Sequence, residues 1–166
     1  MKFIKANDVK EILELGSAIG YSAILMASVK DDIKLTTIER DETRYMECLK
    51  NVKACGLDKS INVVYQDALD VNLAGHKYDL IFIDAAKSQY INFFEKFKNN
   101  LTKEGVIVTD NLFFHGLVEN PEGVSRNTRQ LVGKIKKYVD FLENNNEFGT
   151  KFYDLGDGIS VSKKVS

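Results

Sequence analysis

An apolar segment followed at once by two glycines, within residues 11–22, most constrains what this chain can fold into. The segment reads E-I-L-E-L-G-S-A-I-G-Y-S, and Ile12, Leu13 and Leu15 are typical of a strand buried on both faces of a sheet. Residues 21–29 then favour a helix. A strand, a glycine-rich turn and a helix in this order form the cofactor-binding unit of doubly wound α/β folds.

The chemistry around this turn favours one kind of ligand. Gly16 and Gly20 are spaced G-x-x-x-G, whereas dinucleotide-binding turns have G-x-G-x-x-G. Glu14 lies just before the turn, where a carboxylate would repel a phosphate but would suit a cation. The amino group and sulfonium of S-adenosylmethionine meet this requirement. The turn is therefore interpreted as a methyl-donor site, and the alternative is an ordinary tight connection between a strand and a helix.

Strands and helices alternate along the rest of the chain. The pattern predicts strands over residues 33–39, 61–65, 78–83 and 106–109, and helices capped by Asp41, Ser88 and Ser125. The helix after Ser88 is expected to reach Leu101, and the closing residues 150–163 form a hairpin around a G-D-G turn. This order predicts a mostly parallel sheet with an antiparallel edge and helices on both faces. At 166 residues, the whole chain (1–166) is predicted to be one domain.

Polar side chains follow the predicted strands at the edge where such folds bind ligands. Glu39 follows the second strand, where an acid can accept hydrogen bonds from ribose hydroxyls; the alternative is an acid that caps the next helix. Asp67 follows the third strand. Several carboxylates at one edge are costly to place without a ligand, so a binding site is expected there.

Three oxygen-bearing side chains follow the fourth and fifth strands. Asp84, Asp110 and Asn111 offer the ligands that Mg²⁺ prefers, although they could also be solvated loop residues. Lys87 lies three residues after Asp84. Beside a metal and a sulfonium, like charge lowers the pKa of a lysine, which could then accept a proton from a hydroxyl. The alternative is a solvated lysine at a helix start.

Composition excludes several classes of protein. The net charge of −1 gives no global basic field, and no apolar run approaches the ~20 residues of a membrane span. Cys48 and Cys55 lie on one predicted helix, about 10 Å apart and too far for a disulfide. We therefore expect free thiols in a cytoplasmic protein with no membrane span.

Taken in order, six motifs resemble the metal-dependent O-methyltransferase family, which includes catechol and caffeoyl-CoA O-methyltransferases. They are E-L-G-S-A-I-G-Y-S, I-E-R-D, Q-D-A, I-F-I-D-A-A-K, V-T-D-N and G-D-G-I, and the bacterial branch that methylates tRNA 5-hydroxyuridine is the most similar. The resemblance implies a Rossmann-like class I methyltransferase with a seven-stranded sheet, order 3-2-1-4-5-7-6, and strand 7 antiparallel. It places S-adenosylmethionine among Glu14, Gly16, Ser22, Glu39, Asp67 and Asp84. It also assigns Mg²⁺, or another divalent cation, to Asp84, Asp110 and Asn111, and the role of base to Lys87.

The chain departs from the family pattern in two places. Only ten residues precede the first predicted strand, where family members carry helices that cover the cofactor and help to join the dimer. We therefore expect an open donor site, and a family-like homodimer is weighed against a monomer. Residues 112–116 read L-F-F-H-G, where bacterial relatives often have an arginine near His115. His115 is either a substrate contact or an ordinary loop residue.

The function expected from the resemblance is Mg²⁺-dependent methyl transfer from S-adenosylmethionine to a hydroxyl. The first acceptor is 5-hydroxyuridine in a tRNA anticodon loop. The alternatives are a small catechol-like phenol, or a non-catalytic module that only binds the cofactor. The last helix carries basic residues that either contact phosphates or form a solvated face, namely Arg126, Arg129, Lys134, Lys136 and Lys137.

Overall fold

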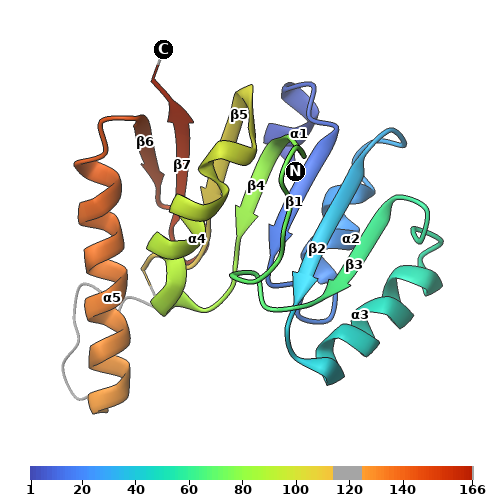
Figure 1. The fold of residues 1–166 in the computed structure, drawn as a ribbon, viewed down its shortest axis with the longest axis horizontal. Helices are drawn as coiled ribbons and strands as arrows, with labels where there is room; N and C mark the ends of the chain where they lie inside the picture. The colour runs from blue at the N-terminus through green and yellow to red at the C-terminus, as the bar shows by residue number, and fades with distance from the viewer. Residues whose placement is uncertain (114–124, 166) are drawn as a thin grey trace.

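The computed structural model, described over residues 1–113 and 125–165, is built on a seven-stranded sheet with the order β3-β2-β1-β4-β5-β7-β6 (Figure 1). Strands β1 to β5 pair with one another in parallel, and β7 is antiparallel to both β5 and β6. The predicted fold class, strand order and antiparallel strand are thus confirmed. The strands are β1 (Glu11–Leu15), β2 (Lys34–Glu39), β3 (Ile61–Tyr65), β4 (Tyr78–Ile83), β5 (Leu101–Thr109), β6 (Phe148–Tyr153) and β7 (Ile159–Lys164).

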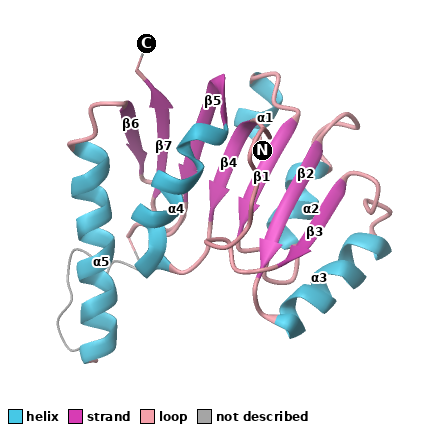
Figure 2. Ribbon diagram, viewed as in Figure 1, coloured by secondary structure: helices cyan, strands magenta, loops and turns pink. Residues whose placement is uncertain are grey.

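Helices cover both faces of the sheet, because every central strand has apolar side chains on each side (Figure 2). One buried cluster joins the sheet to α1 (Lys2–Ala6), α2 (Tyr21–Ala27) and α3 (Glu42–Ala54). A second cluster joins the opposite face to α4 (Tyr90–Phe97) and α5 (Arg126–Glu143), with Phe94 and Tyr138 fully buried. Two short 3₁₀ turns, η1 (Lys87–Gln89) and η2 (Lys98–Asn100), lie on either side of α4.

Two of the three predicted helix caps are confirmed. The Asp41 carboxylate accepts a hydrogen bond from the Arg44 N–H at 2.9 Å, and the Ser125 hydroxyl accepts one from Thr128 at 3.2 Å. The third prediction is wrong, since Ser88 lies inside η1 and caps no helix. Leu101 does not end a helix either. It begins β5 and pairs with Tyr78, so pairing with β4 outweighs the local helical spacing of its side chain.

The buried face of α3 is not set by its largest apolar side chains. Val52 is buried, but Met46 is 58% exposed and Leu49 36% exposed. The residue that packs inward is Cys48. Its sulfur lies against the turn at Gly20, so closely that a Cβ added to Gly20 would lie 2.8 Å from it. Contact with that turn, rather than hydrophobicity alone, sets the orientation of the helix.

Both cysteines are free thiols, as predicted; Cys48 is buried and Cys55 is exposed. In the part of the chain that the structure describes, no helix combines the length and the apolar character needed to cross a membrane.

Candidate active site

The turn between β1 and α2 brings the ends of two strands together. Gly16 has a φ of 95°, and a Cβ at this position would lie 2.3 Å from the carbonyl oxygen of Asp84. A side chain is therefore excluded both by the left-handed backbone and by β4. The N–H groups of Gly16 and Ser17 donate to the Ile38 carbonyl at the end of β2, at 3.0 and 3.3 Å. The turn is thus fixed against both neighbouring strands.

Beneath this turn lies a buried network around Glu14. The Glu14 side chain is inaccessible to solvent, and its carboxyl group accepts hydrogen bonds from the hydroxyls of Ser22 and of Thr37, the latter at 2.5 Å. Thr37 also shares a 2.6 Å hydrogen bond with Ser17. Burial raises the pKa of Glu14 to about 7, against the lowering effect of the two hydroxyls. Glu14 and Ser22 thus hold the turn from below, and their predicted contact with the methyl donor stays a prediction.

Glu39 joins the turn to the start of α3. One carboxylate oxygen accepts from the Ala18 N–H, and the other accepts from the N–H groups of Arg40 and Asp41, each at 2.9 Å. The side chain is only 7% exposed, yet it lines the cavity described next. The helix-start role weighed for Glu39 is therefore present. A carboxylate has about four acceptor positions, so one remains for a ligand hydroxyl.

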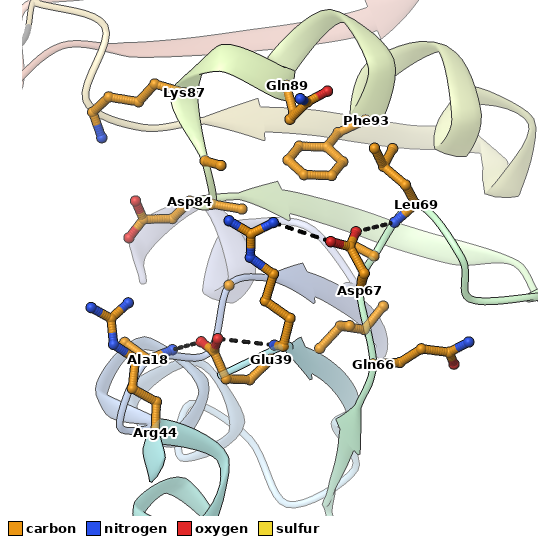
Figure 3. Close-up of a pocket in the computed structure, with 16 residues that line it drawn as sticks. Ala18, Glu39, Arg44, Gln66, Asp67, Leu69, Asp84, Lys87, Gln89 and Phe93 are labelled. Carbon is orange, nitrogen blue, oxygen red and sulfur yellow. Dashed lines mark hydrogen bonds and ion pairs between the residues drawn. The ribbon is translucent and has the colours of Figure 1, made fainter. Parts of the chain in front are cut away.

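A cavity of about 520 Å³ lies at the carboxyl ends of the strands (Figure 3). Its size is in the range of sites that bind small molecules and cofactors. Five residues predicted for donor binding or catalysis line it, namely Gly16, Glu39, Asp67, Asp84 and Lys87. The structure thus brings together residues from the end of β2 and from the segments that follow β1, β3 and β4.

Sequence reasoning missed other residues of this cavity. Arg40 donates to Asp67 at 3.1 Å, while the backbone N–H of Leu69 donates to Asp67 at 2.9 Å and is the first cause that lowers the pKa of its carboxyl group. Leu69 and Phe93 give one wall an apolar surface (Figure 3). Phe93 has the spacing of a core residue, so only its position at the start of α4 could have indicated this role.

Of the three predicted cation ligands, Asp84 lines the cavity, and contacts link it to the other two. The backbone N–H of Asn111 donates to the Asp110 carboxylate at 2.6 Å, and Lys87 Nζ donates to the Asn111 side-chain oxygen at 3.3 Å. Burial and then the charge of Asp110 raise the pKa of Asp84, while Lys87 opposes the shift. Asp84, Asp110, Asn111 and Lys87 thus form one cluster.

This cluster fits a hard divalent cation. Two carboxylates and one amide oxygen are suitable ligands, and the mutual repulsion of Asp84 and Asp110 is what a cation would relieve. Over residues 1–113 and 125–165 there is no group of three or more His, Cys, Asp or Glu side chains placed to hold a metal. The candidate set therefore depends on the oxygen of Asn111, whose backbone has a φ of 60°. His115 lies outside the described residues.

Comparison with known proteins identifies the class of protein. Residues 1–165 match the family model described as O-methyltransferase, so the chain belongs to the O-methyltransferase family of enzymes. A Staphylococcus aureus protein of known structure, assigned as a caffeoyl-CoA O-methyltransferase, is 40% identical with a TM-score of 0.94, covering 99% of this chain and 80% of that one. The caffeoyl-CoA O-methyltransferase of Stellaria longipes is 29% identical over 98% of this chain and 71% of its own length. An S-adenosylhomocysteine-bound methyltransferase of Podospora anserina shares the fold, with 20% identity, a TM-score of 0.89, and coverage of 99% and 76% of the two chains.

Proposed function

We propose that this protein transfers a methyl group from S-adenosylmethionine to an acceptor hydroxyl with the help of a divalent cation. One observation carries the proposal. Asp84 and Lys87 belong both to the cavity behind the glycine turn and to the cluster with Asp110 and Asn111. A donor in the cavity and an acceptor at the cluster would therefore be neighbours.

The cavity residues support binding of the donor. Gly16 lets the backbone approach a ligand closely, and Glu39 keeps an acceptor position for a ribose hydroxyl. Leu69 and Phe93 offer an apolar wall for an aromatic base. S-adenosylmethionine supplies a methyl group activated on a sulfonium, and structures of family relatives contain this cofactor or its product.

The cluster residues support removal of the acceptor proton. Asp84, Asp110 and Asn111 would hold the cation, which supplies Lewis acidity that lowers the pKa of a hydroxyl. Lys87, whose Nζ donates to the Asn111 side chain, would accept the proton. The residues that line the site would then align the methyl donor with the acceptor oxygen. This alignment is the largest contribution to the rate that we expect of such a site.

For the acceptor we propose first 5-hydroxyuridine in a tRNA anticodon loop, supported by the basic residues of α5 near the cluster. A small catechol-like phenol is the second candidate. It is favoured by the relatives named for caffeoyl-CoA, whose acyl group carries a catechol ring.

The test is a methyl-transfer assay with labelled S-adenosylmethionine, with Mg²⁺ or with a chelator. Substrates are tRNA carrying unmethylated 5-hydroxyuridine, and catechol. We expect metal-stimulated transfer that the Lys87→Met variant loses while it still binds S-adenosylhomocysteine. Binding of S-adenosylhomocysteine without transfer to either acceptor would instead indicate a module that only binds the cofactor.

A further inference from the structure

A second hollow lies beside the active site, between α4 and α5. It has a volume of about 180 Å³, smaller than the range typical of drug-sized ligands. Tyr90 and Tyr138, both buried, contribute to its lining. Its polar lining comes from η1, from the first turn of α4 and from the middle of α5, and consists of Lys87, Ser88, Asn92, Lys134 and Lys137. Three lysines thus contribute to the lining of one small hollow, and such a lining is suited to an anion.

The position of the two α5 lysines follows from the packing of the helix. Ile135 and Tyr138 are fully buried against the sheet, so they fix which side of α5 faces inward. Lys134 and Lys137 are one turn apart and line the hollow on one flank of that buried face. Lys136, about 200° from Lys134 around the helix, lies on the opposite flank. Neither Lys134 nor Lys137 forms an ion pair with a carboxylate in the described residues.

The hollow lies beside the proposed acceptor position, because two of its lining residues contact the cluster. Lys87 lines both the hollow and the donor cavity, and its Nζ donates to Asn111. Tyr90, which lines the hollow, donates its hydroxyl to the Asp110 carbonyl at 2.9 Å. A methyl acceptor could thus bind the hollow with an anionic group while its hydroxyl reaches the cluster of Asp84, Asp110, Asn111 and Lys87.

We propose that the α4–α5 hollow binds a phosphoryl group of the methyl acceptor through Lys134 and Lys137. This inference rests on the proposed function and narrows it, because it requires a phosphorylated acceptor rather than a neutral phenol. Asn92 and Ser88 add uncharged donors to the same lining, which suits the several oxygens of a phosphoryl group. Either a phosphate monoester or the phosphodiester of RNA meets this description.

The first experiment measures binding with inorganic pyrophosphate as the probe, by calorimetry at fixed ionic strength. We expect the Lys134→Gln/Lys137→Gln double variant to bind it at least fivefold more weakly than wild type, and Lys136→Gln to bind it as wild type does. Equal weakening by Lys136→Gln, or no binding by the wild type, would overturn the proposal. S-adenosylhomocysteine is titrated in parallel. If the wild type binds S-adenosylhomocysteine but not pyrophosphate, the phosphoryl site is wrong. If it does not bind S-adenosylhomocysteine, the donor site of the proposed function is refuted.

The second experiment identifies the source of the phosphoryl group through three acceptors that share one reactive base. They are 5-hydroxyuridine, its 5′-monophosphate, and a stem-loop RNA that contains it. We expect the double variant to raise KM at least fivefold for the phosphorylated acceptor that is used, with kcat little changed. Preference for the monophosphate assigns a monoester, and preference for the RNA assigns a phosphodiester. Equal use of the free nucleoside would contradict the inference.

Discussion

The aromatic ring of Phe113 lies so close over Gly158 that a Cβ on residue 158 would come within 2.7 Å of it. The backbones are also joined, since Leu112 donates to the Gly158 carbonyl at 3.0 Å and Phe113 donates to Asp157 at 2.7 Å. The turn between β6 and β7 therefore holds the segment that directly follows the proposed cation ligands, Asp110 and Asn111, through two backbone hydrogen bonds and the packing of one aromatic ring.

We predict that Gly158→Ala impairs both stability and metal-dependent turnover. The added methyl group must displace Phe113, which costs ~1–3 kcal/mol as overpacking, in addition to ~1–2 kcal/mol for a left-handed residue. Gly156→Ala is the matched control, because Gly156 has a φ of 60° but nothing within 4 Å of its Cβ position. Urea unfolding and the metal dependence of methyl transfer would be compared, and equal effects of the two variants would contradict this role.

We predict that Glu14→Gln flattens the dependence of stability on pH. The pKa of Glu14 is raised from 4.5 to about 7 in the folded protein, so the native state binds this proton more tightly than the unfolded chain does. Wild-type stability should therefore fall as pH rises from 4.5 to 7, and then level off. The loss approaches about 3 kcal/mol, at ~1.4 kcal/mol per pKa unit. The free energy of unfolding would be measured at pH 5 and pH 8 for both proteins. If the difference between the two pH values is the same in Glu14→Gln as in the wild type, the prediction is wrong.

We predict that Glu39→Gln weakens binding of S-adenosylhomocysteine at least ~tenfold, or about 1.4 kcal/mol. Its carboxylate accepts three backbone N–H groups and faces the cavity, and hydrogen bonds to a charged group are each worth ~1.5–3 kcal/mol. Asp41→Asn serves as control, since asparagine also caps helices and Asp41 is not among the residues that line the cavity. Calorimetric titration, after circular dichroism shows a folded variant, would give the two affinities. Equal affinities would argue against a ribose contact.

We predict opposite effects of Asp110→Asn and Asp67→Asn. Asp110 belongs to the proposed cation site, so its variant should lose metal-stimulated turnover and keep its affinity for S-adenosylhomocysteine within about twofold. Asp67 lies at the donor end with Arg40 and Leu69, so its variant should lose affinity and keep its metal response. Both quantities would be measured for both variants. Full Mg²⁺ dependence in Asp110→Asn would place the cation elsewhere.

Local patterns were sufficient to predict a mostly parallel sheet with an antiparallel edge, whereas the order of its seven strands was implied by the family resemblance. Alternating strands and helices, the caps Asp41 and Ser125, and the G-D-G hairpin each predicted their elements independently. The convergence of Glu39, Asp67, Asp84 and Asp110 follows from the shared direction of parallel strands. Where a local pattern competed with long-range pairing, as at Leu101, the long-range pairing prevailed.

The finer structure of the site could not be predicted, because it depends on contacts between residues distant in the chain. Nothing near Glu14 in the sequence indicates that Thr37, 23 residues later, donates to it beneath the turn. The apolar wall formed by Leu69 and Phe93 likewise joins two elements that no spacing connects. The orientation of Cys48 toward Gly20 is of the same kind.

The insertion of β7 between β5 and β6 has a consequence for synthesis on the ribosome. β6 is made before β7 and does not pair with β5, because β7, which follows β6 in the chain, lies between them in the sheet. The backbone partners of Leu112 and Phe113, at Asp157 and Gly158, are likewise translated more than 40 residues after them. The segment beside the proposed cation ligands therefore acquires its support only after β6 and the turn that follows it have been made, so a nascent chain can form the donor side of the site before the acceptor side.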